Sequence, residues 1–180
     1  MTKIQADLYR YTGNKNSSIF WNFFKIRAFR YQYYYRMSCK KNNFFIKIIL
    51  KILSHRIISK YGFILETTDQ IGPGLMVLST SLLGVNAGSK VGKNCTLSQG
   101  VYLGVANRGK LKGCPKLGDN VWIGPYSMIV GNIKIGNNVW IGPNSYINID
   151  IPDNSRVFGN PPQIIPDESA VKDYIINPIE

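Results

Sequence analysis

An aliphatic residue recurs at every sixth position in the second half of the chain. This column runs through Leu117, Ile123, Ile129, Ile135, Ile141 and Ile147, and a second column four residues later runs through Val121, Ser127, Ile133, Val139, Ser145 and Ile151. A helix repeats every ~3.6 residues and a strand every ~2, so neither element produces this spacing. A six-residue period is typical of a solenoid in which each hexad forms one short strand and one corner.

Three such faces close a triangular coil of about eighteen residues, with the first column filling the core and the second packing beside it. Glycine, asparagine and proline are expected at the corners, because these residues suit left-handed or fixed backbone angles. The phase extends backwards through Ile71, Val77 and Leu83, then by an eight-residue step to Val91, Leu97 and Leu103, with Cys95 in the small-residue column. The stretch from Gly104 to Lys116 is rich in Gly, Lys and Arg and does not fit the period. We therefore predict that residues 104–116 leave the coil as a loop.

Length and composition indicate one compact unit of 180 residues with 44% hydrophobic content. The first ten residues have no apolar core of the signal-peptide kind, and the longest apolar stretch, Phe44 to Leu53, is interrupted by Lys47 and Lys51. That stretch is too short to span a bilayer. Three scattered cysteines are too few for a disulfide or metal framework. We expect a cytoplasmic protein with no metal site.

Positive charge is concentrated before the solenoid. Residues 1–60 hold thirteen Lys or Arg and one acid, Asp7, whereas residues 61–180 hold nine of each sign. The pairs Phe44/Phe45, Ile48/Ile49 and Ile52/Leu53 recur at a spacing of four and predict an amphipathic helix. An earlier helix is predicted over Ile19 to Met37. Taken together, these elements form a basic, aromatic helical region over residues 1–65.

Three interpretations of this basic region stay open. Its apolar face could pack on the solenoid or on a neighbouring subunit, with the lysines solvated. A basic helix with aromatic margins also suits peripheral contact with an anionic membrane. Nucleic-acid binding is the weakest of the three, because no recognition motif accompanies the charge, and we expect no nucleic-acid partner.

Several motifs resemble the hexapeptide-repeat acyltransferases, and among them the serine acetyltransferase-like group that includes short members acting in surface-polysaccharide synthesis. The matching segments are Ile71-Gly72-Pro73-Gly74-Leu75, Val91-Gly92-Lys93-Asn94-Cys95, Ser98-Gln99-Gly100-Val101-Tyr102-Leu103-Gly104, Pro115-Lys116-Leu117-Gly118-Asp119, Gly131-Asn132-Ile133, Val157-Phe158-Gly159-Asn160-Pro161-Pro162 and the opening Asp7-Leu8-Tyr9-Arg10-Tyr11. The resemblance covers more than half of the chain.

The resemblance implies a mainly β fold: a left-handed parallel β-helix over residues 66–165, preceded by the short helical region and followed by a tail over residues 166–180. It also implies a homotrimer that binds acetyl-CoA, the acyl donor, in the groove between two solenoids. The family's cofactor contacts fall on Gly104, Val105 and Ala106 and on Pro125 and Pro143. Proline stands where relatives commonly carry alanine, so a backbone N–H at these two corners is missing.

The general base of the family has no imidazole counterpart in this chain. Ser79 occupies the position of the family's catalytic histidine, Leu78 that of an aspartate, and Cys114 that of a second histidine in the loop. The one histidine, His55, lies in the predicted basic helix and is interpreted as a surface residue. A positioned base contributes about 10² to 10⁴ in rate. The catalytic residue is therefore unassigned, and Cys114 and Asp119 are the nearest alternatives in the loop region.

Two classes of function follow. The first is an acetyl-CoA-dependent O-acetyltransferase that acts on a sugar hydroxyl in surface-polysaccharide synthesis, or on serine, in the cytoplasm and in contact with the inner face of the membrane. The alternative is a catalytically impaired trimeric scaffold or an N-acetyltransferase, because an amine acceptor needs less help from a base.

Overall fold

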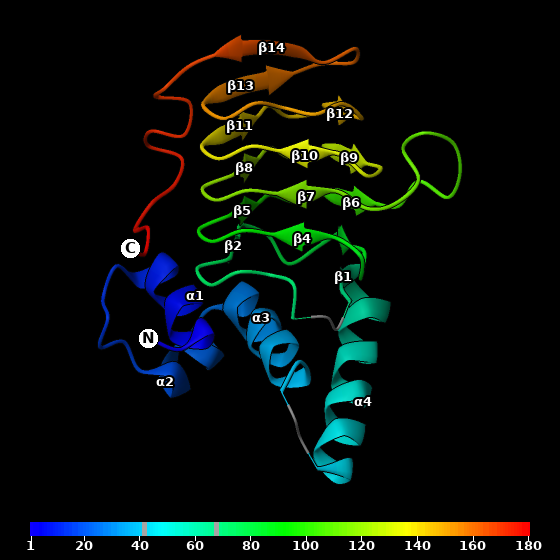
Figure 1. The fold of residues 1–180 in the computed structure, drawn as a ribbon. Helices are drawn as coiled ribbons and strands as arrows, with labels where there is room; N and C mark the ends of the chain where they lie inside the picture. Colours follow the sequence, from blue (N-terminus) through cyan, green and yellow to red (C-terminus); the bar gives the residue numbers. More distant parts are fainter. Residues whose placement is uncertain (41–42, 67–68) are drawn as a thin grey trace.

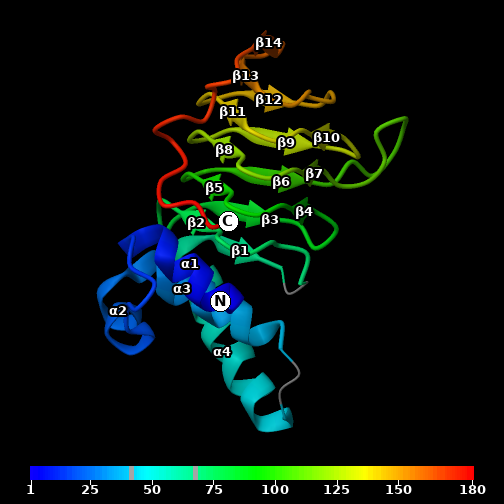
Figure 2. The same cartoon turned by 60° about the vertical axis from the view of Figure 1, so that its left-hand side comes forward.

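A computed structural model describes residues 1–40, 43–66 and 69–180, and it shows a helical region beneath a tall β-coil (Figures 1 and 2). The helices are α1 (Lys3–Thr12), α2 (Ile19–Lys25), α3 (Arg27–Ser38) and α4 (Phe44–Tyr61). They gather at the end of the coil where β1 and β2 lie, and the chain rises from there to β14 at the opposite end.

Short strands stack into three parallel sheets that form the faces of a left-handed prism (Figure 1). The first sheet, here sheet A, contains β1 (Phe63–Leu65), β3 (Leu83–Val85), β6 (Tyr102–Gly104), β9 (Met128–Val130) and β12 (Tyr146–Ile147). Sheet B contains β4 (Lys90–Val91), β7 (Lys116–Leu117) and β10 (Lys134–Ile135). Sheet C contains β2 (Met76–Val77), β5 (Thr96–Leu97), β8 (Trp122–Ile123), β11 (Val139–Ile141) and β13 (Ser155–Phe158), and it ends in the antiparallel strand β14 (Gln163–Pro166).

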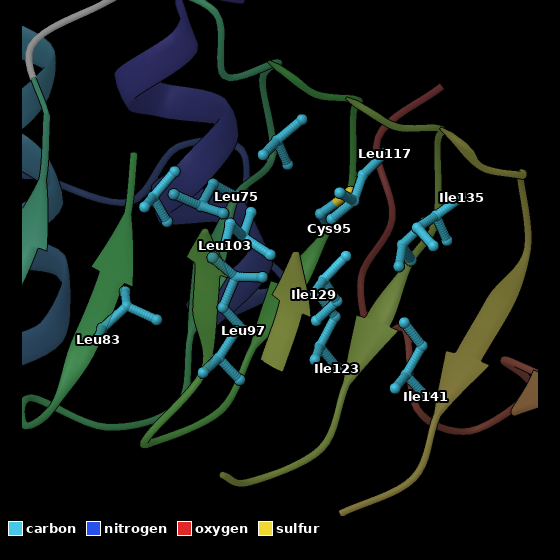
Figure 3. Close-up of a cluster of buried hydrophobic side chains, with 14 of the residues drawn as sticks. Leu75, Leu83, Cys95, Leu97, Leu103, Leu117, Ile123, Ile129, Ile135 and Ile141 are labelled. Atoms are coloured by element: carbon cyan, nitrogen blue, oxygen red, sulfur yellow. The ribbon is translucent and has the colours of Figure 1, made fainter. Parts of the chain in front are cut away.

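Both predicted columns are buried in the prism, and Figure 3 shows members of the first column, such as Leu117, Ile123 and Ile129, in its core. Every member from Leu117 to Ile151 is at most 5% exposed, and Cys95 is fully buried. The register matches an eighteen-residue coil, because Leu117 pairs with Ile135, Ile123 with Ile141, and Ile129 with Ile147. The predicted parallel β-helix is confirmed.

The eight-residue step lies elsewhere than the sequence analysis placed it. Val85, and not Leu83, pairs with Leu103 in the core column of sheet A, while Leu83 pairs with Phe63. The two extra residues therefore fall between Val77 and Val85. Leu83 is still buried, since it takes the inner position that the second column occupies in later coils.

Asparagine builds the corner between sheets B and C. Asn94, Asn120, Asn138 and Asn154 all have positive φ, between 53° and 57°. Their side-chain amides form a ladder along the corner, with donor–acceptor distances of 3.1, 2.9 and 3.0 Å. Asparagine tolerates this left-handed backbone better than most residues, so the predicted corner chemistry is present.

The predicted loop projects from the coil between β6 and β7 (Figure 1). Its two arms are joined by a pair of backbone hydrogen bonds between Ala106 and Gly113, each 2.9 Å long. The tip around Gly109 is exposed. The loop is therefore held at its base, where it leaves the prism.

The helical region differs from the prediction in two respects. α1 was not predicted, although Thr2 and Gln5 form a capping box at its start. The single helix predicted over Ile19 to Met37 is two helices, because Ile26 has extended backbone angles between α2 and α3. The predicted helix around Phe44 is present as α4, but Phe44, Phe45 and Ile49 are more than half exposed and do not pack on the coil. The side chains of Lys47 and Lys51 lie outside the described part of the chain.

A buried ion pair ties α1 and α3 to the first coil. Arg36 Nε lies 2.8 Å from Asp7 Oδ2, and both side chains are at most 3% exposed. Arg36 also donates to the carbonyls of Ile71 and Gly72, at 2.7 and 2.6 Å, and Asp7 accepts from Leu75 N at 2.9 Å. Burial raises the pKa of Asp7, and the charge and hydrogen bonds of Arg36 oppose that rise. The pair satisfies backbone groups that have no preceding coil to bond with.

Replacing Arg36 tests this junction. Arg36→Met should lower the free energy of unfolding by about 3–5 kcal/mol, because it leaves the Asp7 carboxylate buried without its counter-ion. Arg27→Met, in the same helix but exposed, is the matched control and should change it by less than about 1 kcal/mol. Urea unfolding followed by circular dichroism measures both. A loss of under 1 kcal/mol for Arg36→Met would contradict the assigned role.

Candidate functional site

The outer face of sheet A carries an apolar strip. Tyr102 and Met128 point outward from the neighbouring strands β6 and β9 and are 42% and 43% exposed, and Ile64 of β1, which Gly84 of β3 separates from Tyr102, is 38% exposed. In sheet C, the stacked outward rings of Trp122 and Trp140 are instead covered by Tyr174 of the C-terminal tail, which lies 4.9 and 5.6 Å from them, whereas Arg156 and Phe158 of β13 stay exposed. Sheet A is thus a prism face that presents apolar surface to its surroundings.

Three of the predicted cofactor contacts lie at the corner where sheet A passes into the loop. Gly104 ends β6 and its carbonyl accepts from Gly131 N at 3.1 Å. A Cβ atom at position 104 would stand 2.7 Å from Tyr102 Cε1, so a larger residue there would have to displace the Tyr102 ring. Val105 is exposed, and Ala106 begins the bonded base of the loop. This corner is held rigidly while it leaves Val105 open.

The other two predicted contacts stack at the opposite edge of sheet A, where sheet C passes into it. Pro125 and Pro143 occupy the same corner in neighbouring coils, and Pro125 O accepts from Asn144 N at 2.9 Å. Gln99 precedes them in the stack, since its carbonyl accepts from Tyr126 N at 2.9 Å. One chain therefore keeps the two groups apart, on either side of the apolar strip.

Ser79 lies at the same edge as the two prolines. It follows Val77 by two residues, as Gln99 follows Leu97 in the next coil, and Val77 pairs with Leu97. Its hydroxyl is 3.3 Å from that of Ser81, which is not a titratable group at neutral pH. His55 lies on exposed surface of α4, outside the coil.

Cys114 and Asp119 lie away from Ser79. The Cys114 thiol donates to Asn86 Oδ1 at 3.2 Å near the loop base, and burial raises the pKa of the thiol. Asp119 Oδ1 accepts from Lys93 N at 2.8 Å in the corner between sheets B and C, so the carboxylate shapes a turn. A raised thiol pKa is the opposite of what an activated cysteine needs. Neither group is set up as a base beside Ser79 in one chain.

Two features were missed in the sequence. A cavity of about 360 Å³ lies between α3, α4 and β1, lined by residues that include Tyr31, Tyr35, Phe63 and Glu66, and it contains none of the predicted contacts. Sheet B presents an exposed lysine from each strand. The sequence did hold a signal for these lysines, because each precedes a residue of the core column.

Comparison with known proteins agrees with the geometry. Residues 114–148 match the family model for the bacterial transferase hexapeptide (six repeats). Chloroplastic serine acetyltransferase 1 of Arabidopsis thaliana is 34% identical over 119 residues, which cover 66% of this chain and 38% of that protein. The crystal structure of Neisseria gonorrhoeae serine acetyltransferase in complex with serine matches with a TM-score of 0.73 and 26% identity, over 89% of this chain and 66% of that one. A serine acetyltransferase complex with CoA matches with a TM-score of 0.70 and 25% identity, over 91% of this chain and 66% of that one.

The chain is a hexapeptide-repeat protein similar to serine acetyltransferases. The left-handed β-helix implied by the sequence resemblance is the fold it shares with them. The chain spans about two fifths of the length of the curated relatives that it matches. Among the described residues, no cluster of three or more metal-binding side chains is present, and no helix is long and apolar enough to cross a membrane.

Proposed function

We propose that this protein is an acetyl-CoA-dependent acyltransferase of the serine acetyltransferase-like group that works as a homotrimer in the cytoplasm. The similarity to serine acetyltransferases, one of them solved with CoA, supports the donor. The observation that supports the proposal is that the five residues proposed to contact the cofactor lie on either side of an exposed apolar strip.

A second copy would complete the site. Covering the strip around Tyr102 and Met128 with a neighbouring coil removes apolar surface from water, which favours association. The loop corner of one copy, at Gly104 to Ala106, would then face the Pro125 and Pro143 corner of the next. An elongated thioester such as acetyl-CoA fits a cleft with two such walls, and neither wall alone encloses it.

The proposed acceptor is a sugar hydroxyl of a surface polysaccharide, with serine as the less favoured acceptor. The hydroxyl oxygen attacks the thioester carbonyl, the C–S bond breaks, and the hydroxyl proton ends on the CoA thiol. Leu78 and Ser79 present neither a carboxylate nor an imidazole at the corner, so the features that the family resemblance associates with serine are missing. Proton removal must come from the acceptor's surroundings or from the neighbouring copy.

A second function is favoured by the same corner. The Ser79 hydroxyl contacts the hydroxyl of Ser81, and neither of these two groups takes a proton at neutral pH. The neutral fraction of an amine acceptor attacks a thioester without prior removal of a proton, which makes an N-acetyltransferase the first alternative. A trimeric scaffold without catalysis is the other.

Restoring an imidazole separates these functions. Ser79→His should raise CoA thiol release with a hexose or serine acceptor by at least about tenfold, because a positioned base is worth about 10² to 10⁴. Ser81→His is the matched control and should give no gain. Thiol release and calorimetric titration with acetyl-CoA measure both steps.

Three outcomes of this experiment count against O-acetylation. An inert Ser79→His protein that still binds acetyl-CoA would support the scaffold. Thiol release by the unmodified chain with glucosamine but not with glucose would support N-acetylation. Failure to bind acetyl-CoA at all would remove the acyltransferase proposal.

The oligomer is tested at the apolar strip. Met128→Lys places a charge where the proposed trimer buries its contact, so the mass in solution should fall to that of one chain and acetyl-CoA affinity should fall with it. Ile176→Lys, at a similarly exposed residue of the tail, should leave both unchanged. Light scattering after size exclusion measures the mass. A Met128→Lys protein that keeps its mass would contradict this interface.

We also propose that the helical end contacts the inner face of an anionic membrane. Phe20, Trp21 and Phe24 of α2 and Phe44 and Phe45 of α4 are between 59% and 74% exposed. Both helices lie at the end of the prism remote from β14 (Figures 1 and 2). Aromatic side chains on a strongly basic region are typical of proteins that lie in the headgroup layer.

Sedimentation with phosphatidylglycerol vesicles tests the contact. Phe44→Ser with Phe45→Ser should weaken binding by about tenfold or more, because two exposed rings no longer enter the interface. Ile149→Ser with Ile165→Ser, at exposed residues of the coil, is the matched control and should bind like the unmodified protein. Equal binding of both double variants would remove the membrane proposal.

A further inference from the structure

The outer face of sheet B carries a ladder of three lysines. Lys90 of β4, Lys116 of β7 and Lys134 of β10 are directly opposite one another in the parallel register. All three are exposed. Neighbouring strands lie about 4.8 Å apart, so the three lysine side chains leave the sheet from one line along the coil axis.

Stability of the fold does not account for this ladder. None of the three lysines forms an ion pair with any residue in the described ranges. Like charges directly opposite one another in a sheet destabilise it. Sheet A turns apolar side chains outward, the tail covers Trp122 and Trp140 of sheet C, and the exposed Arg156 of sheet C pairs with Asp167. Sheet B is therefore the face that presents a row of like charges.

The loop extends the same positive surface. Residues 90–134 contain seven Lys or Arg and one acid, Asp119, although the chain after residue 60 has no net charge. Arg108, Lys110 and Lys112 of the loop are exposed, and the loop enters β7 next to Lys116. The positive surface therefore runs from sheet B towards the Gly104 to Ala106 corner.

Acidic residues mark the far end of the ladder. Asp150 Oδ1 accepts from the backbone N of Lys134, and Asp153 Oδ1 accepts from the backbone N of Asn137, both at 2.8 Å. Lys116, Lys134, Asp150 and Asp153 all line a groove of about 630 Å³ on this face. The groove is therefore positively charged at the end nearer the loop and negatively charged at the other end.

We infer that the lysine ladder of sheet B binds a linear, carboxylate-bearing polysaccharide that lies along the coil axis. The ladder is one side chain wide, which suits an extended chain better than a folded protein. Ammonium groups repeated at each strand match carboxylates repeated along a polymer. The inference deepens the proposed function, on which it rests, by giving the acceptor an acidic character.

Single-stranded nucleic acid is the competing polyanion. Proteins that bind it combine a basic groove with aromatic side chains on which the bases stack. The outward positions of the described strands in sheet B carry lysine and no aromatic residue, whereas Tyr102 and Trp122 belong to sheets A and C. The face favours the polysaccharide.

Binding of fluorescently labelled octagalacturonate to the full chain, without acetyl-CoA, tests the ladder. In about 50 mM NaCl, where the Debye length is about 14 Å, the triple variant Lys90→Gln, Lys116→Gln, Lys134→Gln should bind about tenfold more weakly, since three surface charge contacts are lost. Lys15→Gln, Lys25→Gln, Lys172→Gln changes the net charge equally at exposed lysines elsewhere and should stay within about twofold. The ladder variant should melt no earlier than the unmodified chain, because a repulsion is removed.

Three results would overturn the inference: equal loss of binding in both triple variants, equal affinity for neutral maltooctaose, or tighter binding of oligothymidylate through the same three lysines. Early melting of the ladder variant would also count against it, because the lysines would then serve the fold. The proposed acyl transfer is tested separately, by measuring the affinity for acetyl-CoA. If the protein binds octagalacturonate but not acetyl-CoA, the ladder proposal is supported and the acyltransferase proposal is removed. If it binds acetyl-CoA but not octagalacturonate, the acyltransferase proposal is supported and the ladder proposal is removed.

Discussion

A β-coil must begin somewhere, and its first turn has backbone groups with no preceding strand to bond with. In this chain, buried side chains of α1 and α3 take the place of that missing turn. Arg36 and Asp7 bond the backbone between Ile71 and Leu75, Gln32 donates to Leu75 O at 2.8 Å, and Arg10 donates to Gly74 O at 2.7 Å. The tail secures this cap from the other side, since Arg10 Nε also donates to Ile176 O at 2.6 Å. Every later coil is stacked on a turn held in this way.

The repeat could be predicted because residues close together in the sequence define it. The cap could not be predicted, because its side chains contact residues that are far away in the sequence. Each core position from Leu117 onward could be read from a period of six. The step between Val77 and Val85 was misplaced because Leu83 is also aliphatic and also points inward, so spacing alone cannot distinguish the two columns. α1 was not predicted because the contacts that hold it in place are made by side chains such as Asp7. The partners of Asp7 are about thirty and seventy positions away in the sequence.

The positions proposed for the cofactor came from the family resemblance, and the sequence did not show how they are arranged in space. The coil explains why they divide into two groups: residues 104–106 lie at the end of β6 in sheet A, whereas the two prolines precede β9 and β12 of the same sheet. The net charge of residues 61–180 gave no sign of the lysine ladder, since nine cations and nine acids cancel in the sum. The strand register nevertheless places Lys90, Lys116 and Lys134 on one face. The coil register is needed to tell which of the charged residues lie together on one face.

Each outward residue of the coil belongs to one of three faces, and the faces differ in a way that bears on the missing base. The tail covers the middle of sheet C at Trp122 and Trp140, the proposed neighbouring copy covers sheet A, and sheet B remains for a ligand. An acceptor held by several charges is delivered at high local concentration, and positioning of this kind can supply a large part of a rate that an imidazole would otherwise provide. A corner with Ser79 in place of a base is therefore compatible with acyl transfer when the acceptor is a polymer that the protein binds along its length, and much less so when the acceptor is a small molecule bound only at the corner.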